Sequence, residues 1–243
     1  AALADYELLE MALFRALPYP ESSRLVSPSL VQKGRDIERM DEATARLAEA
    51  GLPAFESFAL YNSAAVTILG GDYPERVAGA RVSESFFDVL RTTPAQGRTF
   101  TAEETRAGGP KVILLSDGVW TRRFGRRDDI VGERIALDDG TYEVVGVMPA
   151  GFAFPGTSEF WVPLIPRQVA GVLFYTDAIA RLHGSTSVEG ARAALSNLRE
   201  RRKNELPKGS LAAEVRVMTL HARLYGTFTQ PLILLLGAVG CVL

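Results

Sequence analysis

Three pairs of adjacent carboxylates are the residues whose types most directly suggest chemistry. They are Glu103-Glu104, Asp128-Asp129 and Asp138-Asp139. Neighbouring acids can bind a divalent cation or divide general acid and base roles between them. However, side chains of consecutive residues diverge, and all three pairs fall in predicted loops or turns. We therefore interpret them as solvated surface carboxylates, and the sequence predicts no metal ligands.

A nucleophilic site is the second chemistry that the residue types allow. Ser116, Asp117 and His183 are the three types that form a hydrolase triad. No G-x-S-x-G elbow surrounds the serine, so we predict no catalytic residues. A soluble hydrolase that combines loop acids with His183 stays as an alternative. It requires these groups to converge in one cleft with perturbed pKa values.

Two glycine-rich patterns that bind phosphates are missing from the sequence. Neither G-x-x-x-x-G-K-[ST] nor G-x-G-x-x-G occurs. The sequence therefore gives no reason to expect ATP or a dinucleotide on this chain by either route, and no cofactor-binding residues or cofactor are predicted.

Aromatic side chains are abundant in the middle of the chain. Such residues supply much of the apolar area in a core, and they can also form an exposed surface for a hydrophobic substrate. We favour the core and contacts between subdomains, and keep the substrate surface as the alternative. The set is Phe86, Phe87, Phe100, Trp120, Phe124, Phe152, Phe154, Phe160 and Trp161.

Composition limits the classes of partner. The chain has 243 residues, of which 47% are hydrophobic and 23% charged, so it can bury one large core or two smaller ones. A net charge of −2 argues against a nucleic-acid partner. A dense basic cluster, Arg122-Arg123 with Arg126-Arg127, precedes Asp128-Asp129 and predicts a self-compensating surface. With Cys241 as the single cysteine, no intrachain disulfide can form.

The spacing of apolar residues in the first part of the chain predicts helices and short strands. Gly51 stands where a helix C-cap is expected, and Ser83 where a helix N-cap is expected. The predicted elements are helices over 2–17, 36–50 and 84–90, and strands over 24–29, 55–61, 64–69 and 75–82.

The central part predicts a strand over 112–115 that is buried on both faces. Ser116 is expected to cap a helix that runs through Phe124 and ends at Gly125. The Asp139-Gly140 pair suits a tight turn between strands over 133–137 and 141–147.

The last part predicts a strand, a helix and a strand, which together form a βαβ-like unit. The strands are expected over 173–182 and 213–220. Thr186 and Glu189 form a capping-box pattern at the start of the intervening helix. Residues 231–243 carry no charge, and we expect them to begin a transmembrane helix that the sequence truncates; a buried core helix is the alternative.

Several long, ordered motifs resemble one family. The longest is the stretch from Arg98 to Pro163. Three motifs come before it: Leu17-Pro18-Tyr19-Pro20, Arg76-Val77-Ala78-Gly79-Ala80-Arg81-Val82-Ser83 and Phe86-Phe87-Asp88-Val89-Leu90. Two motifs come after it: Ala180-Arg181-Leu182-His183-Gly184 and Leu235-Leu236-Gly237-Ala238-Val239-Gly240. These residues resemble the MacB-like periplasmic core domain of bacterial ABC-transporter permeases with an FtsX-like membrane part. The resemblance covers nearly the whole chain.

The resemblance implies an α+β fold with two lobes. It implies a porter-like lobe of βαβ units, which we place at residues 21–96 and 167–222, and an inserted β-rich second lobe, which we place at residues 97–166. Residues 1–20 are expected to form a membrane-proximal helix. Residues 223–243 are expected to start a truncated transmembrane helix.

The resemblance also implies a function. This chain would be the extracytoplasmic domain of a permease in the bacterial inner membrane, and it would not be an enzyme. It would transmit conformational changes driven by a separate ATPase subunit or domain, and so export or release an amphipathic substrate. The implied partners are that ATPase, a second permease copy in a homodimer and a periplasmic adaptor. A static extracytoplasmic interaction module is a further alternative.

Overall fold

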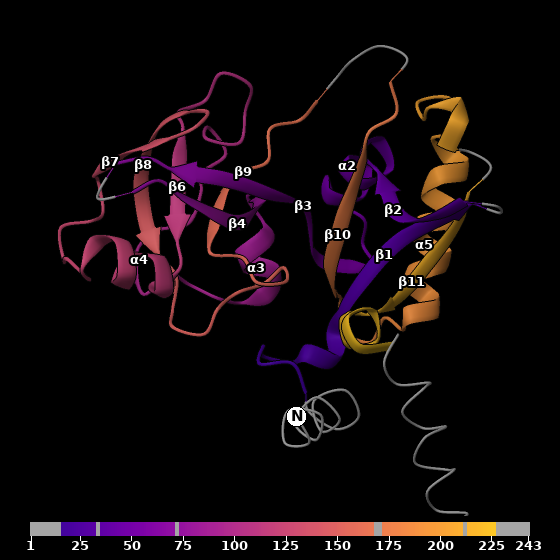
Figure 1. Cartoon of the computed structure of the whole chain (residues 1–243). Coiled ribbons are helices and arrows are strands. Elements are labelled where there is room, and N and C mark those ends of the chain that lie inside the picture. The colour runs from indigo at the N-terminus through magenta and orange to yellow at the C-terminus, as the bar shows by residue number, and fades with distance from the viewer. Residues whose placement is uncertain (1–15, 33–34, 71–72, 168–171, 211–212, 227–243) are drawn as a thin grey trace, which may run out of the picture. The chain divides into compact units, whose positions relative to one another are not determined.

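The computed structural model describes residues 16–32, 35–70, 73–167, 172–210 and 213–226 (Figure 1). The described chain divides into two compact units. Unit 1 contains the residues up to Ser57 and those from Ile179 onward, and unit 2 contains Phe58–Ala178. The chain therefore passes between the units within β3 (Phe55–Ile68) and β10 (Tyr175–Leu182). The expected second lobe, 97–166, lies within unit 2, and the predicted domain boundaries stay predictions.

Unit 1 is a β-structure with two helices. Its strand β1 (Leu25–Gln32) pairs antiparallel with β2 (Arg35–Asp41), with β11 (Glu214–Thr219) and with the end of β10. The helices α2 (Glu42–Glu49) and α5 (Val188–Arg201) contact each other, α2 contacts β2, and α5 contacts β11. Short 3-10 turns occur at Ser22–Arg24 and Lys208–Ser210, and residues 220–226 are helical.

The helix predicted over 36–50 is wrong in its first part. Residues 35–41 form β2, whose backbone pairs with β1, and the helix begins only at Glu42. The buried side chain of Asp41 marks the change, because its Oδ1 accepts a hydrogen bond from the Thr44 amide at 2.8 Å. Apolar spacing alone cannot show that a strand partner is available.

Unit 2 is built on a mixed sheet. β4 (Glu75–Val82) pairs antiparallel with β3 and parallel with β9 (Phe160–Pro163). β6 (Val112–Leu115) pairs antiparallel with β9 and parallel with β8 (Gly140–Val147). β8 also pairs with β5 (Gln96–Gly97) and β7 (Arg134–Leu137). The helices are α3 (Phe86–Leu90) and α4 (Asp117–Phe124).

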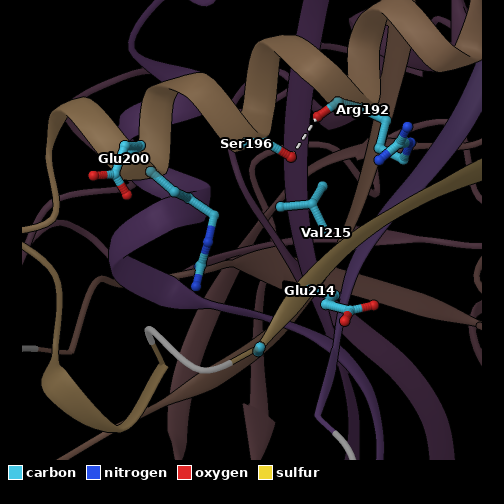
Figure 2. A pocket seen from close by; sticks show the side chains of 7 residues that line it. Arg192, Ser196, Glu200, Glu214 and Val215 are labelled. Carbon is cyan, nitrogen blue, oxygen red and sulfur yellow. Dashed lines mark hydrogen bonds between the residues drawn. The ribbon is translucent and has the colours of Figure 1, made fainter.

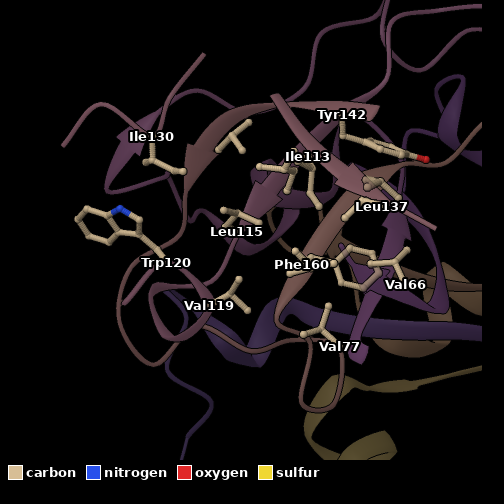
Figure 3. Close-up of a cluster of buried hydrophobic side chains, with 14 of the residues drawn as sticks. Val66, Val77, Ile113, Leu115, Val119, Trp120, Ile130, Leu137, Tyr142 and Phe160 are labelled. Carbon is tan, nitrogen blue, oxygen red and sulfur yellow. The ribbon is translucent and has the colours of Figure 1, made fainter. Parts of the chain in front are cut away.

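The main hydrophobic cluster of unit 2 confirms the central part of the sequence analysis (Figure 3). All four residues of β6 are buried. Ser116 caps α4, since its Oγ accepts a hydrogen bond from the Val119 amide at 3.1 Å, and Gly125 follows with a φ of +60°. The side chains of Val119 and Trp120 then pack into the same cluster as Ile113 and Leu115.

Four local predictions need correction. Residues 55–68 form one strand and not two, because β4 pairs with it continuously from Tyr61 to Ile68. Ser83 does not cap a helix, since its Oγ accepts from the Leu60 amide at 3.0 Å. The turn between β7 and β8 consists of Asp138 and Asp139, one residue earlier than expected. Ser187, and not Thr186, caps α5, because its Oγ accepts from the Gly190 amide.

Two expected segments fall partly or wholly outside the described residues. The helix predicted over 2–17 lies almost entirely outside them, and so do residues 227–243 of the expected transmembrane helix. In the part of the chain that is described, no helix has the length and apolar character needed to cross a membrane.

Candidate functional site

The acid pair Glu103-Glu104 separates into two different environments. Glu103 is exposed, whereas only 4% of Glu104 is exposed, so the prediction that both are solvated is wrong. The Glu104 carboxylate accepts from Arg98 Nη1 at 3.0 Å and Nη2 at 2.7 Å, and from the Thr101 amide at 2.8 Å. Burial alone raises the pKa of Glu104, but the hydrogen bonds from Arg98 and Thr101 outweigh it and hold this pKa below its usual range.

The other two acid pairs lie at the surface, as the sequence predicts. Asp128, Asp129, Asp138 and Asp139 are all exposed. A hydrogen bond with Thr67 keeps the pKa of Asp138 low, and Asp139 accepts from the Tyr142 hydroxyl at 3.0 Å. Within the described residues, no three histidine, cysteine, aspartate or glutamate side chains form a group that could hold a metal ion.

The three residue types of a triad have separate structural roles. The Ser116 hydroxyl is buried and caps α4. The Asp117 carboxylate forms an ion pair with Arg126 Nη2 at 2.8 Å. His183 belongs to unit 1, where it is exposed and its amide donates to the Ala54 carbonyl at 3.0 Å. Within each unit, the geometry of the described residues therefore gives no support to the hydrolase alternative.

The aromatic residues form a core. Phe86, Phe87, Phe154 and Trp161 are at most 6% exposed, and the Phe87 ring centroid lies 5.3 Å from that of Phe86 and 6.3 Å from that of Trp161. Trp161 Nε1 donates to the Phe154 carbonyl at 2.8 Å, so its one polar atom is satisfied. Phe100 joins the cluster through Phe87. These contacts confirm the core interpretation of this set.

Two glycines permit close backbone contacts in the same unit. Gly97 has a φ of +75°, and a Cβ atom there would lie 2.2 Å from the Val145 carbonyl oxygen. At Gly79 a Cβ atom would lie 2.3 Å from the Phe160 carbonyl oxygen and 2.4 Å from its ring. Both distances are far shorter than a real carbon contact, so these positions accept no side chain without displacement.

The arginines of α4 have partners within unit 2. Arg122 binds both carboxylate oxygens of Glu159, at 2.6 and 2.8 Å, and donates from Nε to Glu75 at 2.7 Å. The hydrogen bonds with Glu159, which exceed those with Glu75, raise the pKa of Arg122. Arg123 donates to the carbonyls of Tyr73 and Gly70. The self-compensating surface expected from the sequence is confirmed, and Arg122 takes its two acids, Glu75 and Glu159, from distant parts of the chain.

A polar pocket of about 310 Å³ lies between α5 and β11 of unit 1 (Figure 2). Its lining combines arginines with glutamates: Arg192, Ser196, Arg199, Glu200, Ala213, Glu214 and Val215. Arg199 is 6% exposed and donates from Nη1 to Asp41 Oδ2 at 2.9 Å and to Thr44 Oγ1 at 2.8 Å. The guanidinium of Arg199 therefore binds buried side chains of unit 1. The lining contains two arginines and two glutamates, so its formal charges cancel.

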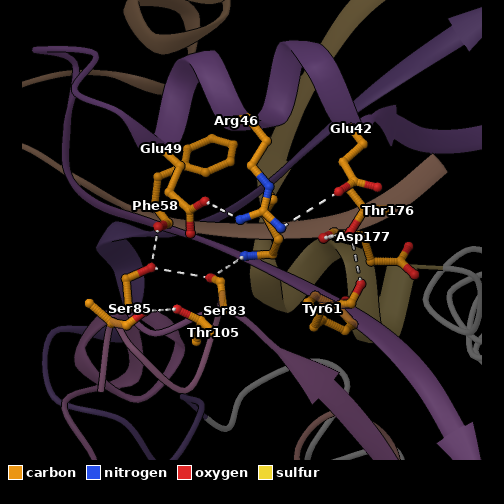
Figure 4. Close-up of polar contacts among 12 residues, drawn as sticks. Glu42, Arg46, Glu49, Phe58, Tyr61, Ser83, Ser85, Thr105, Thr176 and Asp177 are labelled. Carbon is orange, nitrogen blue, oxygen red and sulfur yellow. Dashed lines mark hydrogen bonds and ion pairs between the residues drawn. The ribbon is translucent and has the colours of Figure 1, made fainter. Parts of the chain in front are cut away.

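Polar contacts inside each unit account for further charged side chains (Figure 4). In unit 1, Arg46 lies between two acids of α2, with nitrogen–oxygen distances of 3.6 Å to Glu42 and 3.0 Å to Glu49. In unit 2, the Ser85 hydroxyl donates to the Phe58 carbonyl at 2.6 Å. These contacts hold helices and strands in place.

Charged side chains also hold the segments at the two described ends of unit 1. The sequence analysis did not identify these contacts. We call residues 17–24 the N-side segment and residues 220–226 the C-side segment; both lie at the same end of unit 1 (Figure 1). Arg181 is fully buried and donates from Nη1 to the carbonyls of Pro20 and Glu21, at 2.9 and 3.3 Å. A charged residue within the apolar run from Ile179 to Leu182 was the signal available in the sequence.

The C-side segment is held by an acid. Glu38 of β2 accepts from Arg216 of β11 at 2.5 Å and forms an ion pair with Arg223 of the C-side segment. Arg223 Nη2 also donates to the Glu38 carbonyl at 3.1 Å. Burial, with a smaller contribution from Tyr225 of the C-side segment, raises the pKa of Tyr19 in the N-side segment to about 12.

Comparison with known proteins identifies relatives of this chain. The family model described as the MacB-like periplasmic core domain matches residues 10–198. The macrolide export ATP-binding/permease protein MacB of Chlorobium phaeobacteroides is 29% identical over 151 residues, which cover 60% of this chain and 22% of that protein. The MacB protein of Shigella dysenteriae is 24% identical over 169 residues, or 65% of this chain and 26% of that protein. The chain thus spans about a quarter of these relatives.

Solved structures show the same fold. The periplasmic region of MacB from Actinobacillus actinomycetemcomitans superposes with a TM-score of 0.63 at 14% identity, covering 91% of this chain and 97% of that one. The extracellular domain of the noncanonic ABC-type transporter YknZ from Gram-positive bacteria gives 0.58 at 16% identity, covering 80% and 99%. The predicted α+β class is therefore confirmed. With its family match over residues 10–198, the chain belongs to the MacB-like periplasmic core domains, the extracytoplasmic domains of ABC-transporter permeases.

Proposed function

We propose that this chain transmits conformational change between a membrane-embedded permease and the space outside the cytoplasmic membrane, and performs no catalysis itself. A separate ATPase subunit or domain supplies the energy. The cycle exports or releases an amphipathic substrate. The proposal rests on family membership, because the matched relatives are named as export proteins with both ATP-binding and permease functions.

One structural observation supports this role best. Both described ends of the chain belong to unit 1 and lie at the same end of it (Figure 1). A domain inserted between two membrane helices needs this arrangement, since its two connections must return to the same membrane surface. Charged residues at these ends bind the unit-1 strands directly, so a displacement of either connection acts on the sheet.

The remaining features of the proposal concern partners and location. We expect the full-length protein in the bacterial inner membrane, as a homodimer of permease copies that acts with a periplasmic adaptor. The contacts of Glu104, Ser116 and the aromatic cluster support a non-catalytic domain, because each of these candidate groups serves a fold contact within its own unit.

The decisive experiment reconstitutes the full-length protein with its ATPase in liposomes that are loaded with an amphipathic fluorescent dye. We expect ATP-dependent movement of the dye, and no movement when the ATPase carries an inactivating substitution in its nucleotide site. Hydrolysis of ATP by the 243-residue chain alone, or recovery of the full-length protein from the soluble cytosolic fraction, would contradict the proposal.

A further inference from the structure

Two charged contacts hold the end segments of unit 1: one joins the N-side segment to β10, and the other joins the C-side segment to β2 and β11. We propose that these contacts, the Arg181–Arg24 clamp and the Glu38 bridge, are positioning devices that make both segments move together with the unit-1 sheet. This inference deepens the proposed function, on which its coupling role rests, because it names the residues through which a displacement would reach the domain.

The Arg181–Arg24 clamp is reciprocal. Arg181 of β10 donates to the carbonyls of Pro20 and Glu21 in the N-side segment. In return, Arg24 of the N-side segment donates from Nε at 2.9 Å and from Nη2 at 2.6 Å to the Leu182 carbonyl of β10. Directly after the segment, Leu25 pairs with Arg181 in the sheet. Arg181 thus binds backbone carbonyls of the N-side segment, and Arg24 of that segment binds a backbone carbonyl of β10.

Burial makes this clamp stiff. Arg181 has no exposed surface, so its cation is fully withdrawn from water and depends on the carbonyl oxygens that it binds. Arg24 is further held by ion pairs with Glu21 and Glu56. Hydrogen bonds are directional, whereas apolar contacts allow sliding, so these bonds fix both the position and the orientation of the N-side segment.

The Glu38 bridge holds the C-side segment. One carboxylate oxygen binds Arg216 on β11 and the other binds Arg223 in the C-side segment, while the Glu38 carbonyl accepts a second bond from Arg223. β2, β11 and the C-side segment are therefore joined at a single residue. This bridge is partly exposed, with 38% of the Glu38 side chain accessible, so it is the weaker of the two contacts.

The two contacts are connected through β1. This strand pairs with β10, which carries Arg181, and with β11, which carries Arg216. A displacement of one segment is accordingly transmitted through β1 toward the other. Burial, and to a smaller extent Tyr225 of the C-side segment, raises the pKa of Tyr19 to about 12.

The test measures amide hydrogen exchange in the full-length protein assembled with its ATPase, with Mg-ATP as the probe. Without ATP, Glu38→Gln should raise exchange in residues 220–226 by about five- to tenfold, because the bridge to Arg223 is weakened. The matched control is Glu189→Gln, which removes an exposed ion pair with Arg192 on α5 and should leave residues 220–226 unchanged. If exchange in residues 220–226 of Glu38→Gln equals that of the wild type, the proposed role of the Glu38 bridge is wrong.

The second measurement addresses coupling. We expect ATP to alter exchange in β1 and β11 of the wild type, and the double variant Glu38→Gln/Arg181→Lys to lose that change while hydrolysing ATP within about twofold of the wild-type rate. Arg181→Lys retains the buried charge, so folding is preserved; near-UV circular dichroism verifies this. An undiminished ATP response in the folded double variant would overturn the inference. A wild type without any ATP response would instead contradict the proposed function, and the exchange data without ATP still decide the contacts.

Discussion

The two units are held together by different kinds of contact. Unit 2 depends on edge-to-face contacts between aromatic rings and on backbone contacts at Gly97 and Gly79. Unit 1 places charged side chains in its interior, with Arg181 at 0% exposure and Arg199 at 6%. Apolar packing fills a core without directional bonds, whereas buried arginines bind particular carbonyls and carboxylates and so fix defined segments. Arg181 and Arg199 belong to the unit that carries both described ends of the chain.

The largest effect is expected when unit 1 loses its buried ion pair. Arg199→Ala leaves the Asp41 carboxylate buried without its cation, and we expect the free energy of unfolding to fall by about 3–5 kcal/mol. Urea unfolding of the chain measures this. The exposed Arg201 on the same helix is the matched control, and Arg201→Ala should cost less than about 0.5 kcal/mol. Equal costs would show that the buried Arg199–Asp41 ion pair does not stabilise unit 1 more than an exposed arginine does.

In unit 2 the corresponding substitution introduces a steric clash. Gly97→Ala places a Cβ atom 2.2 Å from the Val145 carbonyl oxygen at a φ of +75°, and we expect a loss of about 3 kcal/mol from overpacking and left-handed strain together. Gly151→Ala separates the two causes, because Gly151 has a φ of +83° with nothing within 4 Å. It should lose only about 1–2 kcal/mol. Equal losses in urea unfolding would remove the argument from close contact.

The aromatic core should respond to a smaller change. Phe87→Leu removes ring contacts with Phe86 and Trp161 while keeping an apolar side chain, so we expect a loss of about 1.5–2 kcal/mol. Tyr73, which is 64% exposed, provides the comparison, and Tyr73→Leu should cost less than about 1 kcal/mol. Thermal unfolding followed by tryptophan fluorescence measures both. A Phe87→Leu variant as stable as the wild type would show that unit 2 does not depend on this ring.

The smallest effect depends on pH. The pKa of Glu104 is lowered in the folded chain, so its carboxylate stabilises the fold above the unfolded pKa of about 4.5, and this contribution is lost as the pH falls through the folded value. At pH 7 we expect Glu104→Gln to cost about 1.5 kcal/mol. The difference from wild type should shrink below pH 4.5. Glu103→Gln, at the exposed neighbour, should show neither effect in urea titrations at pH 3 and pH 7.

Local signals in the sequence were sufficient for much of unit 2. The strand Val112–Leu115, the Ser116 cap and the Gly125 helix end were all predictable, because each depends on residues that are adjacent along the chain. Prediction failed where a distant partner decided the outcome. Residues 35–41 have helix-compatible spacing, yet β1 supplies a strand partner. Ser83 has the composition of a cap, yet its hydroxyl binds the Leu60 amide of β3.

The same distinction applies to the candidate sites. The sequence alone determined the absence of nucleotide-binding glycine motifs, the moderate net charge and the family motifs, since these are properties of residue type and order. Only the tertiary structure decided that Glu104 is a buried partner of Arg98, and that Arg181 and Glu38 bind the two end segments of unit 1. The physical reason is that burial and hydrogen-bond partners arise between residues as far apart as Glu38 and Arg223, whose meeting no local pattern of the chain encodes.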